Sequence, residues 1–151
     1  NYEIFSRNSY TTVAEYATFN GSVAAYSVEA SSTTYAQPMV VTAIAAYANA
    51  GTGSGKARTY TLRVNGANTA VTCTMSNAST CSASGFNVQI QQGDKVNFST
   101  SVTGLPNSSA VAITLSAHAQ VSTRNTYPTT SAKNYLWSGF VRIIGGFLKL
   151  K

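Results

Sequence analysis

The residues best placed for chemistry are the two cysteines, Cys73 and Cys81. If strands flank the segment 74–80, the two sulfurs lie opposite each other across a hairpin centred on Asn77, within the reach of a disulfide. Two reduced, half-buried cysteines are the alternative. A metal site is not expected, because His118 is the only histidine that could complete a ligand set. A disulfide would place the protein outside the reducing cytosol.

The titratable groups that could support catalysis are few. General acid–base catalysis needs paired groups in a cleft, and a carboxylate pair for glycoside hydrolysis has no support in the spacing of the acids. A Ser-His-Asp set built on His118 and Asp94 lacks a nucleophile elbow. We therefore expect His118 to be an exposed strand residue, Asp94 to be a turn residue, and the protein to have neither enzymatic activity nor a cofactor. The acidic residues in question are Glu3, Glu15, Glu29 and Asp94.

The glycine-rich segment 51–56 superficially resembles a phosphate-binding loop. It lacks the four-residue gap between the first glycine and the Gly-Lys pair, and Ala57 replaces the hydroxyl residue that would hold magnesium. We interpret the segment as a flexible loop.

The elements that must position these residues are β-strands. Residues 58–64 alternate apolar with polar side chains, Asn65-Gly66 follows, and residues 69–75 alternate again, which is the pattern of a hairpin with a type I′ turn. A two-residue turn pairs Val64 with Ala67, Leu62 with Thr69 and Tyr60 with Val71. One face of this hairpin then carries Tyr60, Leu62, Val64, Val71, Cys73 and Met75, and the other carries Thr59, Thr61, Arg63 and Thr72.

The same pattern recurs along the chain. Residues 86–90 and 96–100 repeat it around the turn residues 91–95, and 110–117 reads as a further strand. The segment 39–47 suits a helix by its alanines, but the preceding Pro38 and its β-branched residues favour a buried strand. The shared period-two phase predicts a core of Tyr60, Leu62, Val64, Val71, Val88, Ile90, Phe98, Val111, Ile113 and Leu115.

Length and pattern together predict the fold class. A chain of 151 residues fits one domain, which we expect to span 1–151 and to need no metal for stability. The predicted fold is all-β, an antiparallel β-sandwich that is jelly-roll-like, and an immunoglobulin-like sandwich is the alternative.

Charge limits the classes of partner. Only 9% of the residues are charged, against about 25% in a typical domain, and Ser, Thr, Asn and Gln replace the missing charges. The ten basic residues give a net charge of +6 but form no run beyond Lys149 and Lys151, which argues against nucleic-acid binding. No stretch reaches the roughly eighteen apolar residues of a membrane helix, so we expect no membrane partner.

Two short motifs carry a resemblance to a known family. The alternating strands of 58–140, with Gly93-Asp94-Lys95-Val96 and Ser138-Gly139-Phe140-Val141, resemble the closing half of tumour necrosis factor and complement-type jelly rolls. Such domains recur in phage tail fibres and bacterial spore-surface proteins. In that family the Ser-Gly-Phe segment pairs near the subunit interface, so the resemblance implies a homotrimer. Residues 1–50 show no pattern of the family.

The terminal segments 1–20 and 137–151 are richer in apolar residues than an edge strand can safely expose. Either they cover each other within one subunit, or a neighbouring copy completes them by strand addition, which we favour. The residues expected to make these assembly contacts are Tyr2, Ile4, Phe5, Trp137, Phe140, Phe147, Leu148 and Leu150.

Two non-enzymatic functions fit this sequence. In the first, the chain is a structural subunit of an extracellular or virion-surface homo-oligomer, a trimer or a larger assembly, whose low charge suits contacts between copies. In the second, it is a recognition module of a tail-fibre or surface protein, in which Tyr35, Tyr127 or Trp137 contacts a carbohydrate or a protein receptor.

Overall fold

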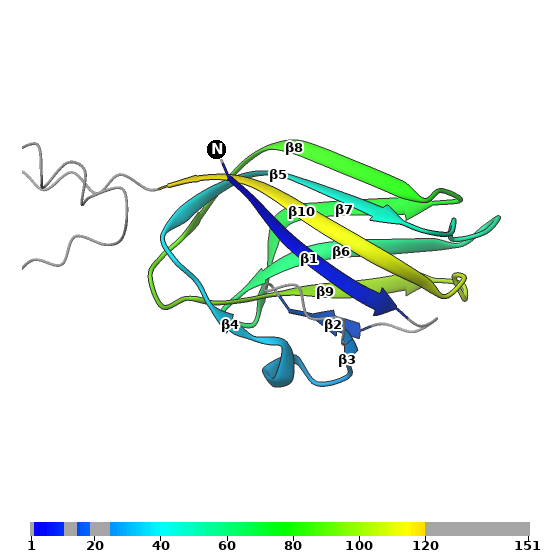
Figure 1. The fold of residues 1–151 in the computed structure, drawn as a ribbon, viewed down its shortest axis with the longest axis horizontal. Coiled ribbons are helices and arrows are strands. Elements are labelled where there is room, and N and C mark those ends of the chain that lie inside the picture. The colour runs from blue at the N-terminus through cyan, green and yellow to red at the C-terminus, as the bar shows by residue number, and fades with distance from the viewer. Residues whose placement is uncertain (1, 11–14, 19–24, 120–151) are drawn as a thin grey trace, which may run out of the picture. The chain divides into compact units, whose positions relative to one another are not determined.

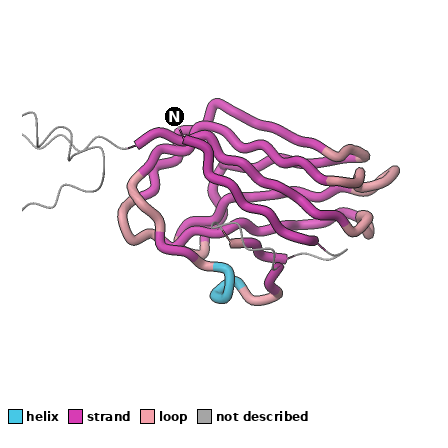
Figure 2. Tube along the Cα trace, in the orientation of Figure 1, coloured by secondary structure: helices cyan, strands magenta, loops and turns pink. Residues whose placement is uncertain are grey.

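The computed structural model describes residues 2–10, 15–18 and 25–119. The chain divides into two units, Asn1–Val121 and Ser122–Lys151, and every described residue belongs to the first. The described part is built almost entirely of strands, with a single short 3-10 helix, and the loops gather at the ends of the strands (Figure 2). The elements are β1 Tyr2–Tyr10, β2 Glu15–Ala17, β3 Ala25–Tyr26, η1 Glu29–Ser32, β4 Thr34–Tyr35, β5 Met39–Ala48, β6 Ala57–Val64, β7 Ala67–Ser76, β8 Thr80–Ile90, β9 Lys95–Thr103 and β10 Ser109–Ala119.

These strands form two antiparallel sheets that pack face to face (Figure 1). Sheet A has the strand order β1-β10-β5-β8, and sheet B has the order β3-β2-β9-β6-β7, with β4 also paired to β9. The predicted all-β antiparallel sandwich is therefore confirmed.

The pairing is nested. β6 pairs with β7, β5 with β8, β2 with β9 and β1 with β10, so the chain follows the path of one long hairpin whose two arms are wrapped across both sheets. This nested order is the jelly-roll arrangement, and it differs from the ABED and CFG sheets of the immunoglobulin-like alternative.

The predicted β6–β7 hairpin is present, with one change of register. Asn65 and Gly66 have φ values of 52° and 80°, as a type I′ turn requires, and Val64 lies opposite Ala67. The register then shifts between Thr61 and Arg63, so that Tyr60 lies opposite Cys73 and the predicted pairing with Val71 is wrong. The shift amounts to an even number of residues, so every side chain keeps its predicted face.

The second predicted hairpin is wrong as a paired unit. β8 pairs with β5 in sheet A, whereas β9 pairs with β6 and β2 in sheet B, so the turn 91–94 carries the chain from one sheet to the other. The segment 39–47 is the strand β5, as predicted, and its Val41 and Ile44 are buried.

The core lies between the two sheets. All ten predicted core residues belong to it, with Val64 and Val88 partly buried and the other eight fully buried. The core also includes β5 residues that the prediction omitted, namely Met39, Val41, Ile44, Ala46 and Ala48.

Candidate functional site

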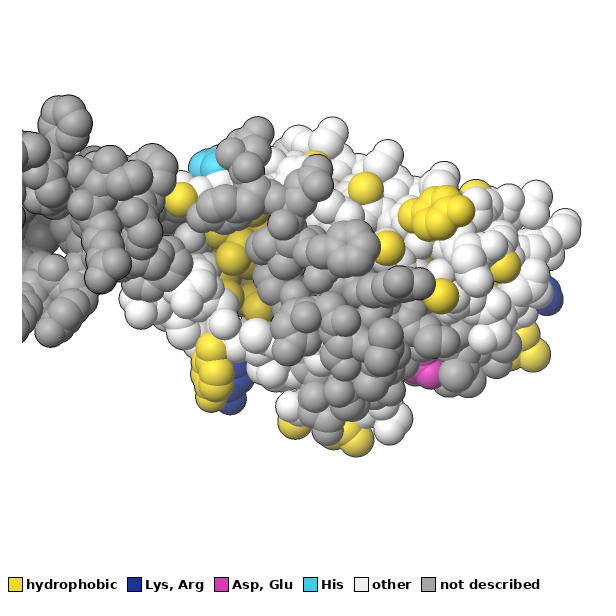
Figure 3. All heavy atoms as spheres, in the orientation of Figure 1, with side chains coloured by type: hydrophobic (Ala, Val, Ile, Leu, Met, Phe, Trp, Pro, Cys, Tyr) yellow, Lys and Arg dark blue, Asp and Glu magenta, His cyan; other side chains and the backbone are white. Residues whose placement is uncertain are grey.

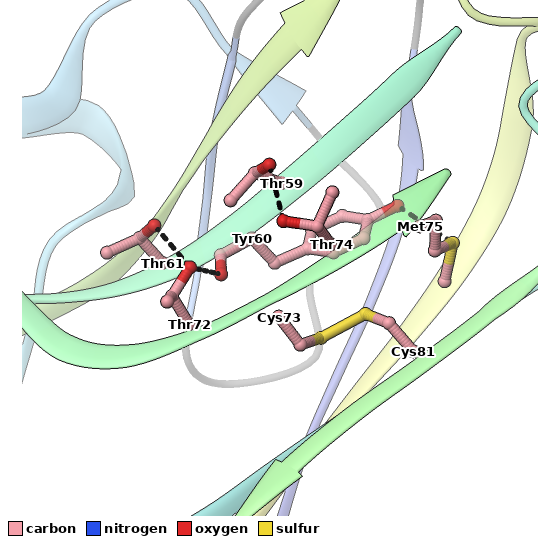
Figure 4. Close-up of a disulfide and its surroundings, with 8 residues drawn as sticks. All are labelled: Thr59, Tyr60, Thr61, Thr72, Cys73, Thr74, Met75 and Cys81. Carbon is pink, nitrogen blue, oxygen red and sulfur yellow. Dashed lines mark hydrogen bonds between the residues drawn. A yellow bond between two sulfur atoms is a disulfide. The ribbon is translucent and has the colours of Figure 1, made fainter. Parts of the chain in front are cut away.

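The predicted disulfide between Cys73 and Cys81 is present, with the two Cα atoms 5.7 Å apart (Figure 4). Its position differs from the prediction, because β7 belongs to sheet B and β8 to sheet A. The bond therefore joins the two sheets along one side of the sandwich and does not cross a paired hairpin. Cys73 is buried beside the core residues Tyr60 and Met75, whose hydroxyl and sulfur atoms lie 3.8 Å apart. These features indicate a structural bond.

Asp94 serves as a turn residue, as the sequence predicts. Its Oδ2 accepts a hydrogen bond of 2.7 Å from the backbone N–H of Gln91, and its Oδ1 accepts one of 2.8 Å from Nδ2 of Asn65. The backbone N–H of Lys95 donates in turn to Oδ1 of Asn65 at 2.9 Å. Asp94 thus joins the β8–β9 turn to the β6–β7 turn, and both of its carboxylate oxygens are engaged.

His118 is exposed near the end of β10, as predicted, at the position opposite Val40 of β5. Among the residues that the structure describes, no three His, Cys, Asp or Glu side chains are grouped so as to hold a metal ion.

Glu29 forms an ion pair that opposes a role in acid catalysis. Nε of Arg63 donates to its Oε1 at 2.5 Å and Nη2 donates to its Oε2 at 3.1 Å, while the guanidinium carbon lies 5.8 Å from the centroid of the Tyr16 ring. These hydrogen bonds from Arg63 lower the pKa of Glu29, whereas a general acid needs a raised pKa. The pair instead fixes η1 against the outer surface of sheet B.

Arg58 is a buried residue that the sequence analysis missed. It is 1% exposed, its Nη1 donates to Oγ of Ser109 at 2.8 Å, and its Nη2 donates to the carbonyl oxygen of Asn107 at 3.3 Å. The sequence did contain a signal that Arg58 is buried. Arg58 shares the period-two phase of Tyr60 and Leu62 and so belongs to the inward face of β6. Its contacts hold the β9–β10 connection, which marks it as a structural residue.

The glycine-rich segment 51–56 is a loop, as predicted. The strand β6 follows it, so there is no helix N-terminus that could complete a phosphate site. Within the loop, Thr52 donates from its backbone N–H to the carbonyl oxygen of Ala78 at 3.1 Å and from Oγ1 to that of Lys56 at 3.0 Å.

The most distinctive surface of the described chain is the outer face of sheet A. Its central part consists of rows of cross-strand neighbours on β10, β5 and β8. Nearly all of the outward side chains in these rows are small. Two shallow hollows lie on these rows, and Tyr47, which is 61% exposed, borders one of them. The central rows of this outer face comprise Ala43, Ala45, Tyr47, Thr80, Ser82, Ser84, Ala112, Thr114 and Ser116.

These central rows lack charge. β5, β8 and β10 contain no Asp, Glu, Lys or Arg, and His118 is their one basic residue. On the side of the molecule drawn in Figure 3, the Lys and Arg side chains that are visible lie near its outline. An uncharged surface of small side chains can approach another surface closely without burying an unpaired charge.

The predicted assembly residues at the N-terminus lie on β1, which pairs with β10 of the same chain. Tyr2 and Ile4 occupy the register positions opposite the buried Ala117 and Leu115, whereas Phe5 is opposite Thr114 of the outer face. No described strand pairs with the other edge of β1. Trp137, Phe140, Phe147, Leu148 and Leu150 lie outside the described residues.

One of the three predicted ligand-contacting aromatics is described. Tyr35 of β4 is 70% exposed and lies opposite Lys95 of β9. Tyr127 and Trp137 lie outside the described residues. Tyr47 was not predicted as a site residue from the sequence, although an aromatic residue among alanines in the segment 39–47 was a visible signal.

No helix among the described residues has the length and apolar character needed to cross a bilayer.

Comparison with family models, curated proteins and solved structures found no match to this chain.

Proposed function

We propose that this chain is a non-enzymatic structural subunit of an extracellular or virion-surface homo-oligomeric assembly. The observation that carries the proposal is the charge distribution in sheet A, in which three of the four strands, β5, β8 and β10, contain no Asp, Glu, Lys or Arg. A freely solvated sheet face normally carries charged residues, which keep monomers apart. An uncharged face of small residues suits contact with further copies.

The disulfide supports the proposed location. Disulfides form and persist in oxidising surroundings, such as the outside of a cell or the surface of a virion, and the Cys73–Cys81 bond joins the two sheets of this sandwich.

The mass of the native protein in solution tests this function. Analytical ultracentrifugation over a concentration series should show a discrete oligomer or a larger particle that dissociates on dilution. A protein that remains monomeric at the highest concentration, and at low as well as moderate ionic strength, contradicts the proposal.

A recognition module is the second candidate, and the exposed Tyr47 favours it. The Tyr47 ring borders a hollow lined by the hydroxyl residues Thr80, Ser82 and Thr114, and this combination suits a neutral, polyhydroxylated ligand such as a sugar. Titration with a panel of neutral oligosaccharides should then show binding that Tyr47→Ala abolishes. Leu105→Ala, which removes an exposed apolar side chain elsewhere, is the control.

A further inference from the structure

β1 is an edge strand with a long and regular free edge. Its nine residues pair with β10 in one continuous register, from Tyr2 opposite Ala117 to Tyr10 opposite Ser109. No described strand pairs with its other edge. Such an edge presents a row of backbone N–H and C=O groups to which a further strand can be added.

The other sheet edges in the described part of the chain are less suitable. β3 has only two residues. β7 and β8 form the two edges on the side of the sandwich that the Cys73–Cys81 disulfide joins, and the pairing of β8 with β5 is interrupted near Gly85, whose φ is 85°. A bulge of this kind disturbs the straight edge that strand addition needs. β1 is therefore the best candidate for a contact between subunits.

The charges of sheet A lie only on this edge strand. β5, β8 and β10 contain none, whereas β1 contains one acid and one base, Glu3 and Arg7. Both lie opposite outer-face positions, with Glu3 opposite Ser116 and Arg7 opposite Ala112, and Phe5 lies midway between them. The two opposite charges are thus at equal distances from Phe5, one on either side of it along the strand.

This arrangement is self-complementary when two β1 strands run antiparallel. With Phe5 opposite Phe5 of the partner subunit, Glu3 lies opposite Arg7 of the partner subunit, and Arg7 lies opposite Glu3 of the partner subunit. The symmetry gives the same pairing twice, as a twofold interface requires. A shift by two residues in either direction places Glu3 opposite a phenylalanine or a serine, so one register alone pairs the opposite charges.

We infer that two copies of this chain associate edge to edge through β1, so that sheet A of one copy continues into sheet A of the next. The inference rests on the proposed homo-oligomeric function and names its contact. The partner is a second copy of the same chain, and the paired segment is Tyr2–Asn8. A larger assembly would add further contacts to this twofold one.

Charge reversal with rescue tests the pairing. Glu3→Arg and Arg7→Glu should each raise the dissociation constant of the oligomer by at least about tenfold, because each places like charges opposite one another twice. The double variant E3R/R7E restores both pairs and should recover association close to that of the wild type. Lys95→Glu makes the same charge change as Arg7→Glu on an exposed residue of β9, and should have little effect.

Cysteine cross-linking tests the register independently. Both native cysteines are joined in the disulfide, so an introduced cysteine is the only free thiol. Phe5→Cys should form a covalent dimer under mild oxidation, because the two Cα atoms at position 5 are about 5 Å apart across the paired strands. Ser9→Cys is the matched control on the same strand, since its two copies are roughly 25 Å apart in this register.

The outcomes separate this inference from the proposed function. A wild-type monomer contradicts both. A stable oligomer that is unaffected by either charge reversal, or that cross-links equally through positions 5 and 9, overturns the β1 contact and leaves the structural function standing. A monomer in which backbone hydrogen exchange is slow on both edges of β1 shows that this chain's own residues cover the edge, and it also overturns the inference.

Discussion

Nη1 of Arg58 lies 2.8 Å from Oγ of Ser109 and donates a hydrogen bond to it inside the sandwich. The two residues lie far apart in the sequence, on β6 and β10, which belong to different sheets. This bond, together with that from Arg58 to the carbonyl oxygen of Asn107, fixes the connection between β9 and β10.

Loss of this contact should destabilise the fold. Ser109→Ala should lower the free energy of unfolding by about 1–3 kcal/mol, because it removes an acceptor from a buried charged donor. Urea denaturation measures the change. In the variant Arg58→Met the donor is absent, so adding Ser109→Ala should cost much less there, and equal costs in both backgrounds would mean that the two residues are not coupled.

Truncation of core residues should be costly in both sheets. Leu62→Ala in β6 and Ile113→Ala in β10 should each lower the free energy of unfolding by about 2–5 kcal/mol, because both side chains are fully buried. Ser101→Ala, on an exposed position of β9, should change it by no more than about 0.5 kcal/mol. Losses below about 0.5 kcal/mol at both core positions would contradict the assignment of the inward face.

Stability should fall at high pH because of Tyr60. Burial raises the pKa of Tyr60 from 10.0 to about 12, against the opposing effect of the nearby Arg58. The folded state therefore keeps the phenolic proton more tightly than the unfolded state. The stability associated with this shift is fully present below pH 10.0 and is lost as the pH rises toward about 12.

Comparison with Tyr60→Phe isolates this effect. Between pH 10.0 and about 12 the wild type should lose at most about 3 kcal/mol more stability than the variant, which has no phenol to ionise at this position. Urea denaturation across this range measures the difference. Parallel stability curves for the two proteins would show that Tyr60 does not titrate differently on folding.

The disulfide should be fully formed and moderately stabilising. Alkylation under denaturing, non-reducing conditions should add no alkyl group, and prior reduction should allow two, one for each cysteine of the chain. The double variant Cys73→Ser and Cys81→Ser should lose about 2–3 kcal/mol, as expected for closing a loop of this length. Uptake of two groups without a reductant would contradict the bond.

The sequence by itself determined the local structure. Alternation with period two identified the strands and the inward faces of β6, β8, β9 and β10, because successive side chains of a strand point to opposite sides. Asn65-Gly66 identified a type I′ turn, since few other residue pairs accept two positive φ values. The two cysteines were paired correctly because they lie at equal distances on either side of a turn at Asn77, which brings the flanking strands close together.

Tertiary structure decided which strands are neighbours. Alternation within β8 and β9 says nothing about the sheet that each joins, because a strand's hydrogen-bonding partners come from distant segments such as β5 and β6. The nested pairing therefore placed two strands predicted as a hairpin in different sheets, and it placed the two cysteines on either side of the gap between the sheets.

The candidate contact surfaces of sheet A likewise depend on which distant strands pair with one another. Sequence composition indicated few charges, but only the strand order shows that sheet A confines its charges to the edge strand β1, where Glu3 and Arg7 lie about Phe5. Burial of Arg58 depended likewise on an acceptor supplied by β10. Strand faces follow from local stereochemistry, whereas edges, neighbours and buried polar contacts depend on long-range packing that no short stretch of sequence encodes.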